Sequence, residues 1–296
     1  AQQSDKHVRA CQNETVQCHV DAAVHDGANC AGLVAVEIGC CCAVHAEVLI
    51  MPDFDYTMEK LSDDLSICVT KDHRFGTDAF LLSDFAHVRR KDLACDLGTG
   101  CGIIPLLWFR NRAEAPKKAY GVDIQELAVK QLTFTVQNAG LDEQMIPVQA
   151  DLSDLSALKE KLPFGSFDVV TCNPPYKKAN HGILSESSSD IIARHETMCS
   201  IEDVCKAAAK LLQFGGRLCI CQRPERLLDV MEAMRKEKIE PKRVRFVQKR
   251  GDTAPWLFLV EGRKGGNRFL KVEQPLIIQD ENGDFSTELK KIYRLI

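Results

Sequence analysis

Beyond Lys91 the sequence alternates between apolar segments typical of buried strands and segments with the periodicity of amphipathic helices. Parallel strands need a long crossover connection, usually a helix, so this alternation predicts an α/β fold with a mostly parallel sheet and helices on both faces. The last two strands are joined only by a loop and predict an antiparallel terminal hairpin in a seven-stranded sheet. The predicted strands are residues 91–98, 117–124, 145–151, 166–173, 217–222, 242–248 and 255–263, and the predicted helices are residues 103–112, 125–141, 200–216 and 225–239.

Local signals mark the ends of two of these helices. Ser200 followed by Asp203 is typical of a helix start, because each side chain can accept a hydrogen bond from the other's backbone N–H. Gly215 and Gly216 then predict the end of that helix, and Gly140 predicts the end of the helix over residues 125–141.

The first fifty residues differ in composition from the rest of the chain. They contain no Phe, Tyr, Trp or Met, yet they hold six of the fourteen cysteines and the whole net charge of −4. The apolar segment 31–38 is too short for a signal peptide and contains Glu37, and the Cys and His residues lack zinc-module spacing, so no metal site is predicted. We interpret residues 1–50 as a non-structural leader ahead of Met51, residues 51–90 as a closing segment, and residues 91–296 as the main domain.

The eight cysteines after Met51 are scattered through apolar segments, and none forms a C-x-x-C pair. This distribution favours buried free thiols in a reducing compartment over a disulfide framework. No segment approaches the roughly 18 consecutive apolar residues that a membrane span needs. The sequence therefore predicts a cytoplasmic protein that does not associate with a membrane.

A glycine-rich loop follows the first predicted strand, with the sequence Asp96-Leu97-Gly98-Thr99-Gly100-Cys101-Gly102. Glycine at alternate positions lets the backbone approach a ligand closely, because no Cβ intervenes. Dinucleotide-binding folds use G-x-G-x-x-G at this place, whereas the third glycine here comes one residue early. Asp96 would repel an anion but attract a ligand with an ammonium group. This combination resembles the first motif of class I S-adenosylmethionine (SAM) methyltransferases, which have a Rossmann-like fold.

Two further acids end the next two predicted strands. Asp123 ends the second strand and is suited to ribose hydroxyls, although nicotinamide enzymes carry an acid there too. Asp151 ends the third strand, where SAM-binding folds hydrogen-bond the adenine amino group. Each acid alone would serve equally well to cap the following helix. Together with Asp96, Gly98 and Gly100, they favour a SAM site over a nicotinamide site.

The fourth predicted strand ends on Asn173-Pro174-Pro175-Tyr176. Proline has no N–H for a central strand and holds the preceding residue extended, so this corner is rigid and rich in acceptors. SAM methyltransferases that modify amide or exocyclic nitrogens carry this pattern after strand four. The Asn173 carboxamide oxygen and the Pro174 carbonyl would accept the two hydrogens of the target nitrogen and direct its lone pair toward the methyl group. Tyr176 would stack on an extruded base, a contact worth roughly 1–3 kcal/mol.

With these motifs in place, the chain from about Asp53 onward resembles the bacterial tRNA1(Val) (adenine-37-N6)-methyltransferase family, in its Gram-positive-type branch. The matching segments are residues 74–86, 96–108, 167–176, 193–196, 223–247 and 275–289. The resemblance implies a SAM-dependent enzyme that methylates N6 of a tRNA adenine, with residues 91–296 as its methyltransferase domain. No obligate protein partner is evident from the sequence.

The family resemblance also implies roles for residues outside these motifs. Phe75, Thr77 and Asp78 match a segment that closes over the methionine part of SAM. Pro175 belongs to the clamp for the target adenine. Arg194, His195 and Glu196 match a family signature that either lines the substrate entrance or holds the loop after the clamp.

A folded tRNA substrate requires a basic protein surface, because each bound phosphate is negatively charged. Residues 242–268 contain eight basic and two acidic side chains, although the chain as a whole is slightly acidic. Any one of these basic residues could equally lie on the ordinary solvated exterior of a hairpin. The prediction of phosphate contacts therefore depends on the whole cluster. The residues predicted to contact phosphates are Lys242, Arg243, Arg245, Lys249 and Arg250.

Four alternatives stay open on the sequence alone. Release-factor methyltransferases use the same Asn-Pro-Pro-Tyr corner to methylate a glutamine side-chain amide, and other enzymes with this corner act on adenine in DNA or on guanine in ribosomal RNA. A non-catalytic RNA-binding module with an inactive SAM fold is a further class, which the intact glycine loop and corner disfavour. Asp96 and the glycine spacing disfavour a nicotinamide oxidoreductase.

Overall fold

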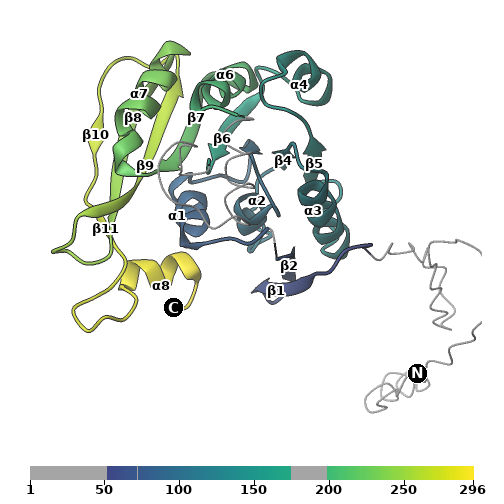
Figure 1. Ribbon diagram of the computed structural model, residues 1–296, viewed down its shortest axis with the longest axis horizontal. Coiled ribbons are helices and arrows are strands. Elements are labelled where there is room, and N and C mark those ends of the chain that lie inside the picture. Colours follow the sequence, from purple (N-terminus) through teal and green to yellow (C-terminus); the bar gives the residue numbers. More distant parts are fainter. Residues whose placement is uncertain (1–51, 72, 175–198) are drawn as a thin grey trace, which may run out of the picture. The chain divides into compact units, whose positions relative to one another are not determined.

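The computed structural model describes residues 52–71, 73–174 and 199–296 (Figure 1). All described residues belong to one compact unit, Met51–Ile296. The predicted leader therefore lies outside the described residues, as do Pro175, Tyr176, Arg194, His195 and Glu196.

The main sheet of the described residues contains β3 (Leu93–Leu97), β4 (Lys118–Asp123), β5 (Met145–Gln149), β6 (Phe167–Cys172), β7 (Leu212–Gln222), β8 (Ile239–Gln248), β9 (Pro255–Lys264), β10 (Lys271–Val272) and β11 (Leu276–Ile277). Their order is β10-β8-β9-β7-β6-β3-β4-β5, and β11 also pairs with β8. Within this described sheet β9 alone runs in the opposite direction, because it pairs antiparallel with both β7 and β8 while the other pairs are parallel.

The predicted α/β class and mostly parallel sheet are confirmed, since β3 to β9 correspond to the seven predicted strands. The sequence did not predict β10 and β11, two short strands that run parallel to β8. Since β3 lies between β4 and β6, the strand order reverses there, and ligands of such folds bind beyond the carboxyl ends of the strands at that point.

The described helices cover both faces of the sheet (Figure 1). They are α1 (Thr77–Phe85), α2 (Ile103–Trp108), α3 (Glu126–Asn138), α4 (Leu155–Lys161), α6 (Ile201–Leu211), the short 3-10 helix η1 (Pro224–Arg226), α7 (Leu227–Lys236) and α8 (Thr287–Tyr293). One core contains apolar residues of α1, α2, α3 and α8, and the other contains those of α4, α6 and α7. Ala94 faces the first core and Cys95 the second, because neighbouring strand residues point to opposite faces. None of these described helices is long and apolar enough to cross a membrane.

The predicted helix over residues 200–216 begins as expected but ends earlier. Ser200 and Asp203 form a reciprocal capping box, which confirms the predicted start. The helix ends at Leu211, and β7 begins directly at Leu212, which pairs with Phe167. Gly216 lies inside that strand, where a Cβ would stand 2.8 Å from the Phe167 carbonyl oxygen. The prediction that the two glycines end this helix was wrong, because Gly216 instead permits a close approach of two strands.

The closing segment contains a hairpin of β1 (Thr57–Ser62) and β2 (Leu65–Val69), followed by α1. The Cys68 N–H donates to Thr135 Oγ1 at 3.0 Å, and Gln131 Nε2 donates to the Cys68 carbonyl at 3.4 Å. Both partners belong to α3 and are fully buried. The hairpin is therefore attached to the main domain through both backbone groups of Cys68.

Candidate functional site

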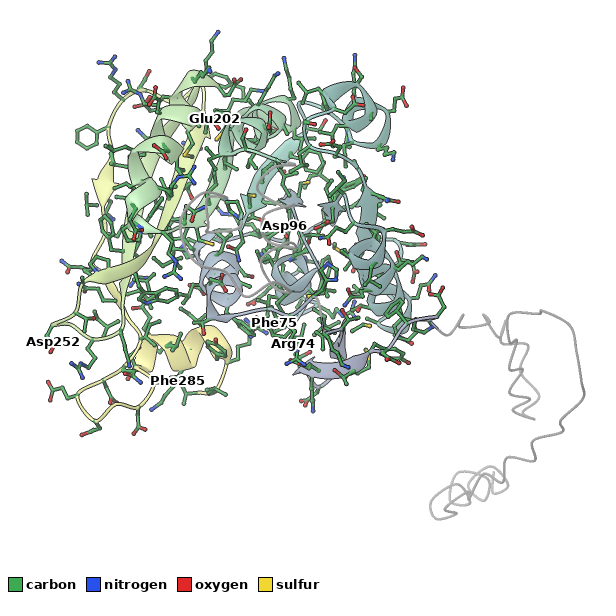
Figure 2. All side chains as sticks on the ribbon, viewed as in Figure 1. Arg74, Phe75, Asp96, Glu202, Asp252 and Phe285 are labelled. Carbon is green, nitrogen blue, oxygen red and sulfur yellow. The ribbon has the colours of Figure 1, made fainter. Side chains whose placement is uncertain are left out.

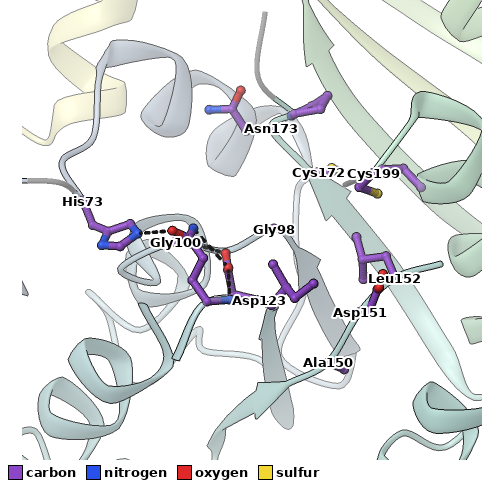
Figure 3. A pocket seen from close by; sticks show the side chains of 14 residues that line it. His73, Gly98, Gly100, Asp123, Ala150, Asp151, Leu152, Cys172, Asn173 and Cys199 are labelled. Carbon is purple, nitrogen blue, oxygen red and sulfur yellow. Dashed lines mark hydrogen bonds between the residues drawn. The ribbon is translucent and has the colours of Figure 1, made fainter. Parts of the chain in front are cut away.

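A cavity of about 260 Å³ lies at the carboxyl ends of β3, β4, β5 and β6, where the strand order reverses (Figure 3). Its lining residues are Gly98 and Gly100 after β3, Asp123 to Gln125 after β4, Ala150 to Leu152 after β5 and Cys172 to Pro174 after β6, together with His73, Cys199 and Val204. The structure thus brings together the glycine loop, two of the three predicted acids and Asn173. Each comes from a different strand end, as the sequence predicted.

The glycine loop presents open backbone to this cavity. Gly98 and Gly100 both have positive φ, of 68° and 55°, and a Cβ at either position would meet no atom within 4 Å. The N–H groups of Gly98 and Thr99 donate to the Val122 carbonyl at 2.8 and 3.0 Å, which holds the loop against β4. Gly102 has a different role, because a Cβ there would lie 2.3 Å from Leu132 Cδ1 in the core.

Asp123 is held by a chain of hydrogen bonds (Figure 3). Its Oδ2 accepts from the Gly100 N–H at 2.8 Å, and its Oδ1 accepts from the Gln125 N–H at 2.9 Å. Gln125 Oε1 in turn lies 3.1 Å from His73 Nε2. Asp123 is buried, and these hydrogen bonds fix the position of its carboxylate, as an acceptor for ligand hydroxyls needs. Sequence reasoning missed His73 and Gln125, which no motif singles out.

Asp151 does not cap the helix that follows it. Its Oδ1 accepts from the N–H and the hydroxyl of Ser153 at 2.8 and 2.7 Å, whereas Asp154 caps α4. The sequence left open whether Asp151 was only a helix cap, and the structure assigns that role to Asp154. Asp151 lines the cavity, where it stays the predicted contact for an adenine amino group.

Asp96 is not among the described residues that line the cavity, and it lies near the centre of the domain in Figure 2. It is fully buried, and its Oδ1 accepts a hydrogen bond from the Thr171 hydroxyl at 2.6 Å. Its Oδ2 has no hydrogen-bond partner among the described residues. Burial raises the pKa of this carboxyl from 3.8 to about 7, although the Thr171 hydrogen bond and the nearby Thr99 hydroxyl oppose the rise. A buried acid with one unpaired oxygen fits a site that receives a positively charged ligand group.

Asn173 follows the last residue of β6 and lines the cavity. Its Nδ2 donates to Asp78 Oδ2 at 3.0 Å, and its Oδ1 lies 3.0 Å from the Sγ of Cys221 in β7. Sequence reasoning missed Cys221, whose thiol is buried beside the predicted clamp.

Phe75, Thr77 and Asp78 are not among the described residues that line the cavity. Phe75 packs against Phe80 with 6.0 Å between ring centroids, and Thr77 Oγ1 accepts from the Tyr293 hydroxyl at 3.1 Å. A role for these three residues in closing over the cofactor stays a prediction.

The cavity contains two cysteines, Cys172 and Cys199. Burial raises the pKa of the Cys199 thiol to about 12 and that of Cys172 well above its usual value, so both are protonated at neutral pH. Among the described residues no group of three or more His, Cys, Asp or Glu could hold a metal ion. The lining residues therefore favour binding and orientation of ligands over thiolate chemistry.

The predicted phosphate contacts divide into two groups. Arg243 pairs with Glu261 at 3.1 Å and stacks 3.8 Å from the Phe85 ring centroid, and Arg245 pairs with Glu288 at 2.7 Å. Their side chains are only 15% and 18% exposed, so these two arginines connect β8 to neighbouring elements instead of facing solvent. Lys242 is half-buried and donates to the Asn267 carbonyl at 2.9 Å.

Lys249 and Arg250 are exposed in the turn between β8 and β9, which Asp252 marks in Figure 2. Because β8 runs parallel to β6 and β7, this turn lies at the same edge of the sheet as Asn173. Arg250 pairs with Asp252 at 3.1 Å, but both side chains are more than half exposed. These two residues retain the predicted role as phosphate contacts.

Comparison with known proteins identifies similar sequences and folds. A family described as "Methyltransferase domain" matches residues 89–262. A tRNA1(Val) (adenine(37)-N6)-methyltransferase of Histophilus somni (strain 2336) is 27% identical over 242 residues, which cover 80% of this chain and 94% of the relative. A protein of the same name from Porphyromonas gingivalis (strain ATCC 33277) is 26% identical over 187 residues, covering 61% of this chain and 69% of its own.

Among solved structures, a predicted O-methyltransferase from Agrobacterium tumefaciens matches with a TM-score of 0.58 at 19% identity, covering 73% of this chain and 95% of that one. This match shows a shared fold. The sequence similarities confirm the predicted resemblance to the tRNA1(Val) enzymes, while the branch within that family stays a prediction.

The buried Asp96 carboxyl should make stability depend on pH. Its pKa is 3.8 in the unfolded chain and about 7 in the folded protein. The free energy of unfolding is therefore highest below pH 4, where the carboxyl is protonated in both states, and it falls as pH rises through about 7. Asparagine does not ionise, so Asp96→Asn prevents this fall in stability. The substitution should stabilise the ligand-free protein by about 4 kcal/mol at pH 8, but by less than half of that at pH 5. Urea unfolding at both pH values measures the difference.

The exposed Asp142→Asn serves as the matched control and should change stability little at either pH. Equal stabilisation by Asp96→Asn at pH 5 and pH 8, or destabilisation at pH 8, would contradict the raised pKa.

Proposed function

The chain belongs to the methyltransferase-domain family, and we propose that it methylates N6 of an adenine in tRNA, with SAM as the methyl donor. The observation that carries the proposal is the position of Asn173, which lines the same cavity as Gly98, Gly100, Asp123 and Asp151. A nitrogen held by Asn173 would therefore lie beside whatever ligand the glycine loop binds. The similarity to tRNA1(Val) adenine(37)-N6-methyltransferases, which extends over 94% of the Histophilus protein, supports a tRNA adenine as the target.

The residues in and near the cavity fit SAM on three counts. The open space above Gly98 and Gly100 leaves room for a ligand against the backbone. Asp123 and Asp151 would accept from the ribose hydroxyls and the adenine amino group of the cofactor. Asp96 would complement its positive charge, which accounts for a buried carboxylate with an unpaired oxygen. SAM, when bound, supplies a methyl group on a positively charged sulfur.

The chain's own contribution to the reaction is to orient and activate the target nitrogen. The lone pair of an adenine amino group is delocalised into the ring, which makes that nitrogen a weak nucleophile. Asn173 Oδ1 and the Pro174 carbonyl would accept its two hydrogens, turn the lone pair out of conjugation and stabilise the positive charge that develops on nitrogen. No general base is required, because the product ammonium is acidic enough to release its proton to water.

The proposal is tested by identifying the methylated product. The full chain is incubated with tritiated SAM and total tRNA that lacks modification, and the digested nucleosides are separated. We expect the label in N6-methyladenosine. A parallel reaction contains a peptide-chain release factor in place of tRNA, because the Asn-Pro-Pro-Tyr corner also occurs in methyltransferases that act on glutamine. Label confined to the protein, or to another nucleoside, would exclude the proposed target.

Asn173→Ala should reduce kcat by about 10²–10³-fold, because it removes an acceptor that acts on charge developing in the transition state. The affinity for SAM should stay within about threefold of wild type, since the side chain is proposed to contact the substrate nitrogen. Single-turnover methylation and calorimetric titration with SAM measure the two quantities. Asn138→Ala, an exposed change at the end of α3, is the matched control, and full turnover by Asn173→Ala would remove the clamp from the proposal.

Replacing both Lys249 and Arg250 by alanine should weaken tRNA binding equally for all tRNA sequences. It should also reduce the slope of log K against log salt by about 2, because two phosphate contacts are lost. Filter binding between 50 and 300 mM KCl measures this slope. The control pair is Lys117→Ala with Lys118→Ala at the amino end of β4, on the opposite edge of the sheet. An unchanged slope for Lys249 and Arg250 would mean that they are ordinary surface residues.

A further inference from the structure

Asp78 contacts the predicted target clamp. It lies in the first turn of α1, and its Oδ2 accepts a hydrogen bond from Asn173 Nδ2 at 3.0 Å although the two residues are 95 positions apart. The family resemblance assigned Asp78 to the cofactor, yet it is not among the described residues that line the cavity. One of its contacts is with the residue proposed to hold the substrate nitrogen.

This hydrogen bond determines which way the carboxamide points. The two ends of a carboxamide have nearly the same shape, so only their partners decide the orientation. The Asp78 carboxylate can only accept, which requires Nδ2 to face it. Cys221 Sγ, a weak donor, lies 3.0 Å from Oδ1 at the other end. A reversed carboxamide would place its oxygen against a carboxylate and would offer N–H groups to an amino group that is itself a donor.

Gly76 provides the space that the Asp78 carboxylate occupies. Gly76 precedes α1 with φ −116° and ψ −177°, an extended backbone that any residue can adopt. A Cβ at this position would lie 2.7 Å from Asp78 Oδ1. The backbone conformation therefore does not require glycine at position 76. Glycine is needed because a Cβ would collide with the Asp78 carboxylate in its observed position.

The helix that carries Asp78 is firmly anchored. The Tyr293 hydroxyl donates to Thr77 Oγ1 at 3.1 Å, and the Phe80 and Tyr293 rings stack with 4.3 Å between centroids. Leu81 and Leu82 are completely buried in the core on the same face of the sheet. A side chain on such an element holds its partner more accurately than one on a loop.

We propose that Asp78 is the positioning residue of the clamp: it holds the Asn173 carboxamide with Oδ1 directed at the target nitrogen. Asp78 acts through Asn173 and does not touch the substrate, and Gly76 is glycine because a larger residue would displace the carboxylate. This inference rests on the proposed function, since the target nitrogen is the adenine amino group assigned there.

Asp78→Asn tests this role, because asparagine has the same shape but can satisfy Asn173 in either orientation. We expect kcat for tRNA methylation to fall about 10–100-fold, the effect of losing a hydrogen bond to a charged group, while the Kd for SAM stays within about twofold. Gly76→Ala should lower kcat in the same direction without altering the Asp78 side chain. Asp63→Asn, whose side chain is 95% exposed in the β1–β2 turn, is the control and should leave both quantities unchanged.

Two outcomes would overturn the proposal. A Kd for SAM at least tenfold weaker with unchanged kcat at saturating SAM would make Asp78 a cofactor contact. A wild-type kcat and Kd in Asp78→Asn would leave it without a role in the clamp. Failure of the proposed function can be told apart from failure of this positioning role, because in that case the wild-type protein itself would produce no N6-methyladenosine in tRNA.

A second measurement tests the hydrogen bond without any turnover. In protein labelled with ¹⁵N-asparagine, the Asn173 side-chain amide signal is assigned by its disappearance in Asn173→Ala. We expect this signal to shift and its protons to exchange faster in Asp78→Asn, but not in Asp63→Asn. An unchanged signal in Asp78→Asn would refute the contact itself, and with it the positioning role.

Discussion

The hydrogen bond between Thr171 and Asp96 joins the two strands on which both halves of the site depend. Asp96 in β3 and Thr171 in β6 are register partners, and the bond between their side chains is 2.6 Å long and fully buried. The glycine loop leaves β3 directly after this pair, and Asn173 leaves β6 two residues after Thr171. If one strand slipped by one residue, the side chain of Asp96 or Thr171 would point to the other face of the sheet and the hydrogen bond would be lost. This polar pair therefore helps to specify how the glycine loop faces the clamp.

The same pair costs free energy, because it buries the carboxylate of Asp96, and a purely structural contact would avoid this cost. Thr171 could donate equally well to an asparagine oxygen at position 96, without a buried charge. Instead the second carboxylate oxygen has no partner among the described residues, and burial raises the pKa of Asp96 to about 7. Natural sequences depart from good local packing and polar pairing mainly at functional sites. A carboxylate at this position therefore fits the proposed role of complementing a charged ligand group better than a role in stabilising the sheet.

The central sheet and the glycine loop could be predicted from sequence because their signals are local. Strands such as β3 and β6 are buried on both faces and therefore read as continuous apolar segments. Contacts between distant residues leave no such signal. Arg243 counted as part of a basic surface, although Glu261 neutralises it once β8 and β9 pair. Asp78 was likewise assigned by its local motif, whereas its partner Asn173 is 95 positions away.

The contacts of Asn173 connect the chemistry to the packing of one face of the sheet. Asp78 comes from α1 and Cys221 from β7, and both elements contribute residues to the same hydrophobic core. The carboxamide is therefore held from two sides by elements that cannot move independently without opening that core. An acceptor for a developing charge is useful only if it is already oriented before the reaction, since reorganisation would consume the stabilisation it provides. The closing segment supplies α1 and therefore helps to orient the clamp, whether or not it also contacts the methyl donor.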